Sequence, residues 1–544
     1  MNFSEYLQVV RAAAMEKSHD ELRNALQVVV LTVIVMSVGA WLHKVVWIPL
    51  KMRRIMAKQG VGMTPFRILF GNIRESVAYA AKFPEDCHVD GYYESTPTVY
   101  PQHALYFPLH GSRFVYEWGS ETRLAVRDPE FTREVLSTKQ AYFRKPEFHR
   151  KFMGEVVGQK CIAIVEDPPT HQSHRRKLNP FFYPDALKAM VDGMVEGAAS
   201  GIQRLDEKVS QGGGVADFDV LPDLYCASNQ ILTRTMLSSD VERGRQLYKC
   251  QTQLVEILYG SLSKLSFWIP GYRFFPTKDN REIASLKSEM RNLLTEIIGA
   301  RTKAFGDGNE GGYGDDILGQ MLMIAGTAPQ GATKGAPFNL ESVVDNTQMF
   351  YMAGQDTVAV VVAFAMLMLA RHPEWQDRAQ KEVNEVLASG KAIDVNGLNR
   401  LKIVGMVINE TLRLFSSLPR IPKVAVQDVQ VRDLFIPKGL TVEVAVQSMH
   451  LDPALWGEDV HKFNPERFAN GPASASTHPQ AFLPFSAGLH YCLGTNYAMN
   501  EMKIMLAMML QRFQILVSPH YKHRPYFAFV QRPKYGMRLI LKRV

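Results

Sequence analysis

Cysteine is scarce in this chain, and the few that occur are not paired. The 544 residues include five cysteines at irregular positions: Cys87, Cys161, Cys226, Cys250 and Cys492. An odd, scattered set excludes a disulfide framework and indicates a reducing compartment. The sequence also lacks internal repeats and any basic-aromatic block, so its net charge of +8 does not indicate nucleic-acid binding. We expect anionic lipid or an acidic protein to face the basic surface.

Long apolar runs are few, and the clearest lies near the N-terminus. Residues 24–43 contain no Asp, Glu, Lys or Arg, and twenty helical residues cross a hydrocarbon core about 30 Å thick. Basic residues follow this run, whereas residues 1–23 hold four acids against three bases. The positive-inside rule therefore predicts a lumenal segment (1–23), a transmembrane signal anchor (24–43) and a basic, Gly/Pro-containing linker (44–65) leading into the cytosol.

Two alternatives for the apolar run are a cleaved signal peptide and a buried core helix. The residues before it are not predominantly basic, and the apolar character continues past Val38-Gly-Ala40. Both observations disfavour cleavage.

Residues 66–544 read as one helix-rich unit with few strands. Apolar residues recur at helical spacing over long stretches, whereas alternating strand patterns are short: Thr122–Val126, Leu440–Val444 and Arg538–Leu541. The glycine-rich segments 212–214, 305–314 and 325–337 read as surface loops. We predict a mainly α fold with a small β region and one N-terminal transmembrane helix.

The most informative segment is Phe485–Gly494, in which Cys492 lies in a frame of Phe and Gly. Glycine at two of its positions permits tight turns and close approach of the backbone to a flat group. Apolar residues at helical spacing over Thr495–Phe513 place Cys492 near a helix N-terminus, where the dipole and free amides lower a thiol pKa. These features suit a thiolate ligand of a metal. The alternative is a small, buried apolar cysteine.

This segment resembles the haem-binding loop of the cytochrome P450 superfamily, Phe-x-x-Gly-x-Arg-x-Cys-x-Gly. Phe485, Gly488, Cys492 and Gly494 match the pattern, and His490 stands where Arg is usual. The resemblance implies haem b whose iron is bound by Cys492. His490 would donate a hydrogen bond to a propionate but carry little charge near neutral pH. We therefore expect haem retention to be weaker or more pH-sensitive.

A second motif lies inside the longest apolar helix, expected over Leu340–Ala370. Ala353, Gly354, Asp356 and Thr357 interrupt it, although Gly costs about 1 kcal/mol there and a buried acid several. Such conflicts mark functional sites. By resemblance, the Ala-Gly pair leaves a groove for O2, the threonine hydroxyl donates a hydrogen bond during oxygen activation, and the acid relays protons. The alternative is an ordinary kinked core helix.

A third group of residues has a structural role in the family. Glu410 and Arg413 lie at i,i+3 on one helix face, and Arg467 belongs to the Pro-Glu-Arg-Phe element at Pro465–Phe468. By resemblance, these three form a buried ionic triad that locks the loop carrying Cys492. Removing one partner of such a pair costs more than the pair contributes.

The resemblance also implies contacts to the haem propionates. His171 and Arg175 lie at i,i+4 after Asp167-Pro-Pro, a favourable helix start. Lys423 occupies a second propionate position, where the family has an arginine that can pair bidentately and lysine cannot. Two propionate arginines are thus replaced, at 423 and 490.

Several stretches look like the plant clan that contains brassinosteroid, gibberellin and cytokinin hydroxylases and triterpenoid oxidases, including His174–Phe181, Ile269–Lys278 and Ser518–Tyr521. The resemblance implies a single-pass enzyme of the endoplasmic reticulum with a cytosolic catalytic domain. Its partners would be an NADPH-dependent diflavin reductase, with cytochrome b5 as a further donor, and the lipid bilayer. It would insert one oxygen atom from O2 into a lipophilic terpenoid, steroid-like hormone or fatty acid.

Two other functions remain open. A haem-thiolate isomerase or lyase acting on hydroperoxides tends to lose the helix threonine, and Thr357 is present. A non-catalytic haem-binding or sterol-binding membrane protein is suggested by His490 and Lys423. Arg420 also allows two readings, since by resemblance Ser416–Pro422 passes over the haem. The side chain either turns outward to a propionate or solvent, or faces the pocket and binds a substrate carboxylate.

Overall fold

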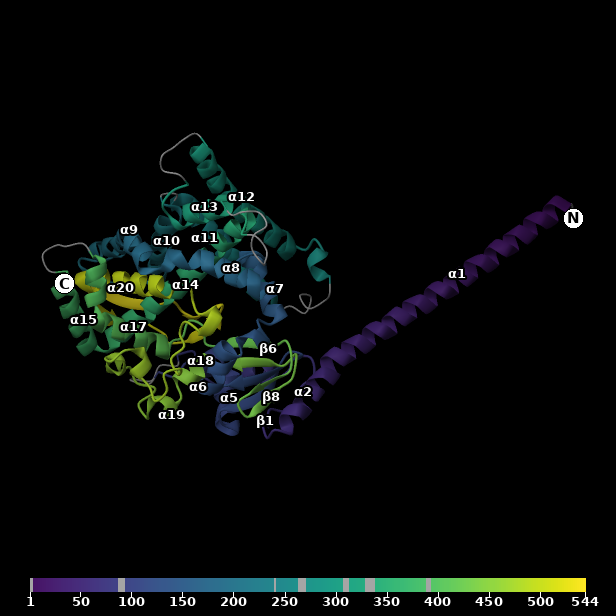
Figure 1. Cartoon of the computed structure of the whole chain (residues 1–544), viewed down its shortest axis with the longest axis horizontal. Coiled ribbons are helices and arrows are strands. Elements are labelled where there is room, and N and C mark those ends of the chain that lie inside the picture. The colour runs from purple at the N-terminus through teal and green to yellow at the C-terminus, as the bar shows by residue number, and fades with distance from the viewer. Residues whose placement is uncertain are drawn as a thin grey trace.

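The computed structural model of the chain describes residues 3–86, 93–238, 241–262, 271–306, 313–327, 338–387 and 393–544. Helices make up most of the body, and the strands labelled in Figure 1 lie at the side from which the N-terminal helix leaves. This confirms the predicted fold class. Gly212–Gly214 form a turn as expected, whereas Cys87 and much of the loops expected at 305–314 and 325–337 lie outside the described residues.

Long helices form the body because each must bury an apolar face against its neighbours. The larger ones are α9 (Pro184–Gln211), α10 (Leu221–Leu237), α11 (Val241–Leu262), α12 (Lys278–Gly306), α14 (Leu340–Arg371), α15 (Pro373–Val386), α17 (Lys402–Leu414) and α20 (Thr495–Arg512). The shorter ones are α3 (Ile73–Ala80), α4 (Thr96–Val99), α5 (Pro101–His110), α6 (Pro129–Arg133), α7 (Glu147–Val157), α8 (Pro168–Leu178), α13 (Ile317–Thr327), α16 (Val395–Arg400), α18 (Val446–His450) and α19 (Pro453–Trp456).

Helix α14 is the central element of the body. It is apolar and long enough to cross a membrane. Its most apolar 18 residues have a mean hydropathy of 1.8, but 78% of that stretch is buried inside the protein. It packs against α10, α17 and α20. It is therefore a core helix, and the predicted helix over Leu340–Ala370 is confirmed.

The largest sheet has six strands in the order β1-β2-β3-β9-β6-β4. Its strands are β1 (Gly62–Met63), β2 (Arg113–Trp118), β3 (Glu121–Val126), β9 (Thr441–Val444), β6 (Ile421–Ala425) and β4 (Phe143–Arg144). A second sheet joins β10 (Phe513–Val517), β13 (Arg538–Arg543) and β5 (Val215–Asp219). Two hairpins pair β11 (Pro525–Ala528) with β12 (Val530–Pro533), and β7 (Val429–Val431) with β8 (Leu434–Ile436). The three predicted strands correspond to β3, β9 and β13.

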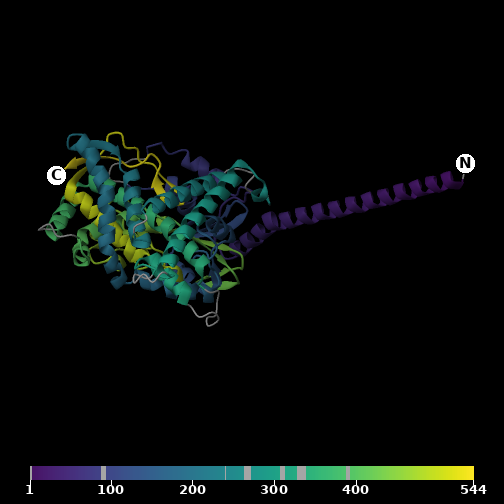
Figure 2. The ribbon, with the colours of Figure 1, turned by 90° about the horizontal axis from the view of Figure 1, so that it is seen from above.

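The N-terminal helix projects from the body in both views (Figures 1 and 2). Helix α1 (Phe3–Leu42) continues through a π-helical turn, His43–Trp47, into α2 (Ile48–Ala57). The most apolar 18 residues within Leu26–Ala57 have a mean hydropathy of 2.0, and none of them is buried. An exposed apolar helix of this length is consistent with a membrane anchor.

Part of residues 44–65, predicted to form a linker, packs onto the body. Met52 and Met56 of α2 are buried, and the Arg53 guanidinium donates to both carboxylate oxygens of Glu117 at 2.8 and 2.9 Å. Strand β1 pairs in parallel with β2. Helix α2 therefore packs on the sheet and continues into α1, which projects from the body.

Candidate active site

The segment before α20 folds into a tight loop that ends at Cys492. A 3-10 turn forms at Gly488–His490. Ser486 and the first glycine of this turn adopt the left-handed region, with φ of 65° and 68°. A side chain on that glycine would collide with the carbonyl of Leu136, so the fold itself requires glycine at position 488.

The two ends of the motif differ from this tight centre. Phe485 is half-buried against the core, and its carbonyl accepts the Cys492 amide at 2.9 Å. Gly494 has φ of −90°, and the nearest atom to an added Cβ, on Phe182, is 4.0 Å away. Residues 493–494 form a turn, and protein atoms leave open space beside Gly494, so close approach of a flat group there stays a prediction.

The Cys492 thiol is solvent-accessible although it lies deep among protein atoms, as expected of a side chain that faces an internal space. The prediction of a lowered thiol pKa is wrong in direction. Burial raises the pKa of Cys492, and the Gly494 amide, the Thr495 hydroxyl and the Arg175 charge only partly offset it. A bound metal ion deprotonates a coordinating thiol outright. Thiolate character at this position would therefore depend on iron rather than on the helix alone.

Basic side chains from distant parts of the chain gather beside this loop. The rings of His171 and His490 lie 4.5 Å apart between centroids. Arg175, one turn further along α8, donates to the Tyr491 carbonyl at 2.8 Å. Lys423 joins them from β6 and is buried. The structure thus brings together the four basic residues predicted to bind propionates.

The basic residues beside the cysteine loop have too few acidic neighbours to neutralise them. Burial, together with the charge of the neighbouring Lys145, lowers the pKa of Lys423 to about 7. Burial likewise lowers the pKa of His171 to about 4 and that of His490 to about 2, helped in both cases by nearby lysines. Glu166 is the one acid found to act on Lys423 among the described residues. We refer to Lys145, His171, Arg175, Lys423 and His490 as the cationic cluster.

The cationic cluster and the accessible thiol together suit haem. The ring Nδ1 of His171 is buried without a hydrogen-bond partner, and within the described part of the chain the Lys423 ammonium makes no hydrogen bond or ion pair. Buried polar groups without partners are costly, so an anionic group is expected to complete the cluster. Two propionates beside a thiol ligand would do so. Lys145 was not predicted, because no local pattern marks it.

The residues predicted for oxygen activation share one region of α14. Ala353 is exposed and Gly354 and Thr357 are half-buried, although most neighbouring residues of this helix are buried. The Thr357 hydroxyl donates to the Ala353 carbonyl at 2.6 Å. An added Cβ at Gly354 would lie 2.8 Å from the Leu232 side chain of α10, so close helix packing also favours glycine there.

Asp356 is held by a residue that the sequence did not reveal. Arg532, on β12, donates to the carboxylate of Asp356 at 2.9 Å. Burial raises the pKa of Asp356, and the charge of Arg532 opposes that rise. Nothing local in Gln531-Arg532-Pro533 indicates this contact, since the two residues lie 176 positions apart.

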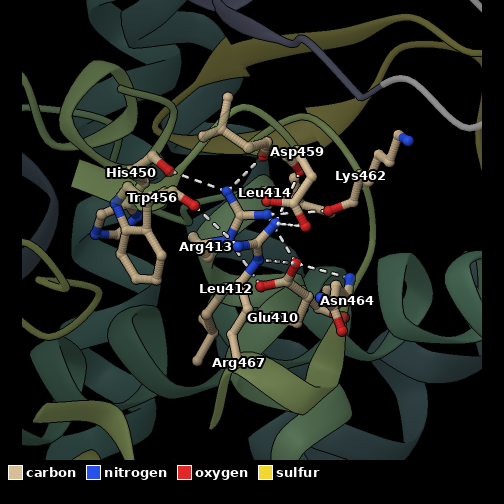
Figure 3. A network of polar contacts seen from close by, with 12 residues as sticks. Glu410, Leu412, Arg413, Leu414, His450, Trp456, Asp459, Lys462, Asn464 and Arg467 are labelled. Carbon is tan, nitrogen blue, oxygen red and sulfur yellow. Dashed lines mark hydrogen bonds and ion pairs between the residues drawn. The ribbon is translucent and has the colours of Figure 1, made fainter. Parts of the chain in front are cut away.

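Glu410, Arg413 and Arg467, predicted to form an ionic triad, lie together, and the Arg413 guanidinium uses all its N–H donors (Figure 3). Glu410 and Arg413 have no exposed side-chain surface, and two bonds of 2.7 Å join them. Arg413 also donates to the carbonyls of His450, Val460 and Lys462 at 2.7–3.1 Å. Arg467 lies 3.6 Å from Glu410.

The triad contacts a different segment from the one expected. Besides those of Arg413, its bonds run from Arg467 to the carbonyls of Trp456 and Asp459, and from the Asn464 amide to Glu410. Among the described residues, none of its three members hydrogen-bonds to residues 483–494. The triad therefore fixes residues 450–464 directly, and any hold on the cysteine loop must pass through another residue.

Arg420 has a partner inside the protein, which removes the basis for a substrate carboxylate there. Its guanidinium donates to Glu443 of β9 at 3.0 Å. Glu443 also accepts from Arg123, His103 and Tyr116 at 2.6–2.9 Å. Burial would raise the pKa of Glu443, but the charge of Arg420 and the contacts with His103 and Arg123 hold it well below its usual range. Both readings from the sequence missed this pairing.

Comparisons with known proteins agree with this arrangement. The family model described as Cytochrome P450 matches residues 97–539. Cytokinin hydroxylase of Arabidopsis thaliana is 31% identical over 495 residues, which is 91% of this chain and 93% of that protein. The 7-deoxyloganic acid hydroxylase of Catharanthus roseus is 31% identical over 517 residues, 93% of this chain and 96% of that protein.

A solved structure shows the same fold. The cytochrome P450DA heme domain superposes with a TM-score of 0.73 at 19% identity, over 89% of this chain and 98% of that one. The accessible thiol, the cationic cluster, the matching family model and the hydroxylase relatives all agree: the chain belongs to the cytochrome P450 family of haem-thiolate monooxygenases.

Proposed function

We propose that this protein is a monooxygenase of the endoplasmic reticulum membrane that hydroxylates a lipophilic terpenoid, steroid-like hormone or fatty acid. Two of its relatives are named as hydroxylases of small molecules. The observation that carries the proposal is the accessible but deep-lying Cys492 beside a cationic cluster with too few acids. An NADPH-dependent diflavin reductase would supply electrons, with cytochrome b5 as a further donor.

Haem, when bound, supplies the redox chemistry and the activation of O2, and a thiolate ligand favours O–O cleavage. The chain's own residues would bind and orient it. Cys492 would hold the iron. The cationic cluster would pair with the propionates, with Arg175 already oriented by the Tyr491 carbonyl. Lys423 contributes a point charge rather than a bidentate contact.

Proton handling would fall to Thr357 and Asp356. The Thr357 hydroxyl donates to the Ala353 carbonyl, and release of that bond would let it donate into the accessible space beside α14. Asp356 would supply protons from a carboxyl whose pKa is raised by burial and restrained by Arg532. We expect Thr357→Ala to keep haem and substrate binding but to divert NADPH electrons to hydrogen peroxide. Unchanged coupling of NADPH to product would contradict this role.

The test of ligation is spectroscopic. The ferrous protein with CO should show the strongly red-shifted Soret band that a thiolate ligand gives, and Cys492→Ala should abolish it. A wild-type band at the position of histidine-ligated haem would overturn the proposal. Reductase-dependent NADPH consumption in microsomes separates a monooxygenase from an isomerase or a non-catalytic haem protein, since neither of those consumes NADPH.

Membrane topology can be tested on the same microsomes. The exposed apolar helix would cross the membrane with residues 1–23 in the lumen, because basic side chains follow it on the body side. Protease added to sealed microsomes should then digest the catalytic body. Protection of that body would reverse the proposed orientation.

A further inference from the structure

His450 lies between the ionic triad and the cysteine loop and contacts both. It is the last residue of α18 and has no exposed surface. Its carbonyl accepts Arg413 Nη1 at 3.0 Å. Its ring Nε2 accepts the backbone amide of Leu483 at 2.8 Å, and Leu483 lies two residues before the motif that ends at Cys492. One residue therefore joins the triad to the start of the loop.

The imidazole of His450 is fully hydrogen-bonded in one tautomer. Because Nε2 accepts from Leu483, the neutral ring carries its proton on Nδ1 and donates to Ser416 Oγ at 2.8 Å. The Ser416 hydroxyl donates in turn to the Leu412 carbonyl at 3.2 Å. Burial, together with the charge of Arg413, lowers the pKa of His450 to about 3, so the ring stays neutral over the working pH range.

The cysteine loop needs such an anchor because its backbone is strained. Ser486 adopts a left-handed conformation, which costs a residue other than glycine on the order of 1–3 kcal/mol and persists only when the surroundings hold it. Gln140 accepts the Leu489 amide at 2.7 Å in the middle of the loop, and Arg175 bonds Tyr491 near its end. The contact of His450 with Leu483 holds the beginning.

We propose that His450 is a positioning residue that holds the start of the cysteine loop in register with the ionic triad and thereby keeps the Cys492 thiolate on the haem iron. The proposal rests on the haem-thiolate function proposed above. It assigns the coupling to one hydrogen bond, from the Leu483 amide to Nε2.

Two substitutions separate the two sides of the ring. The amide of Asn reaches the place of Nδ1, so His450→Asn keeps a partner for Ser416 and leaves the Leu483 amide without an acceptor. The amide of Gln reaches the place of Nε2, so His450→Gln keeps an acceptor for the Leu483 amide and loses the hydrogen bond to Ser416. His523→Gln is the matched control, because His523 is also buried and its ring bonds Tyr521 rather than the loop.

The first measurement is the ferrous CO spectrum of the full-length holoprotein. We expect H450N to convert from the red-shifted band to the histidine-like position roughly tenfold faster than wild type, as one lost buried hydrogen bond allows. H450Q and H523Q should convert at the wild-type rate. Equal rates for H450N and H450Q would overturn the proposal, because loss of packing or of Ser416 would then explain the effect.

The second measurement is hydrogen exchange of the peptide spanning residues 483–492, which does not depend on the CO band. Exchange should be roughly tenfold faster in H450N only. If H450N fails to hold haem while H450Q holds it, the difference supports the proposal; if both fail alike, it is wrong. If the wild-type protein lacks the red-shifted band, the proposed function is wrong. The exchange experiment would still decide whether His450 anchors the loop.

Discussion

The ionic triad and the cationic cluster are two groups of buried charges that differ in how they are neutralised. In the triad, Arg413 uses all five N–H donors on Glu410 and three backbone carbonyls. In the cationic cluster, basic groups face one another, and burial together with nearby positive charge lowers the pKa of Lys423, His171 and His490, so the two imidazoles are neutral near pH 7. The charges of the triad are paired within the protein, although Arg467 Nε has no hydrogen-bond partner. The cluster needs an anion from elsewhere.

This difference separates a structural site from a binding site. A buried charge network that is fully satisfied stabilises one conformation, whereas an incomplete one costs free energy until a ligand completes it. Two groups of similar residue types can therefore have opposite effects on the stability of the haem-free protein. The following predictions test that comparison.

The largest effect is expected at the triad. Glu410→Ala leaves the Arg413 guanidinium buried without its carboxylate, which should lower the free energy of unfolding by about 3–5 kcal/mol. Denaturant unfolding and the yield of haem-bound protein measure the loss. Arg378→Ala is the control, because its pair with Glu466 is 47% and 56% exposed and should contribute at most about 1 kcal/mol. Equal losses in the two variants would contradict the role of burial.

An effect of opposite sign is expected at the cationic cluster. The pKa of Lys423 falls from 10.5 to about 7 on folding, so between these values the unfolded chain binds the proton more readily. Stability of the haem-free protein should therefore rise as pH increases through that range. Lys423→Met should remove this dependence and stabilise the haem-free protein at pH 7 by on the order of 1–3 kcal/mol, while weakening haem binding.

Unfolding of haem-free protein as a function of pH, together with haem titration, tests the Lys423 prediction. Lys438→Met serves as the control, because this lysine is exposed. A haem-free Lys423→Met variant that is less stable than wild type would show that this charge is compensated, and the contrast with the triad would fail.

The smallest effect is expected at Arg420, a second compensated pair. Arg420→Leu leaves Glu443 with Arg123, His103 and Tyr116, so the cost should be only about 0.5–1.5 kcal/mol of stability. The affinities for carboxylate ligands and for neutral ligands, both measured by the Soret shift, should fall to the same small extent. A selective loss of carboxylate binding would restore the reading in which Arg420 faces the substrate.

Sequence motifs located most of the candidate site but only part of its chemistry. The frame around Cys492, the helix with Ala353 and Thr357, and the pair of Glu410 with Arg413 lie in short segments whose spacing is informative. The direction of the thiol pKa was wrong, because burial outweighs the helix N-terminus. The triad reaches the cysteine loop only indirectly, through His450, because hydrogen bonding depends on which loop lies beside it.

The sequence by itself determined the helical fold, the apolar N-terminal helix and the residue types that suit haem, because these depend on local periodicity and short motifs. Only the tertiary structure decided which charges are compensated. Arg532 meets Asp356, Glu443 meets Arg420, and His450 meets Leu483 across 176, 23 and 33 positions of the chain. Such pairings follow from how helices and strands pack, and no local pattern records them.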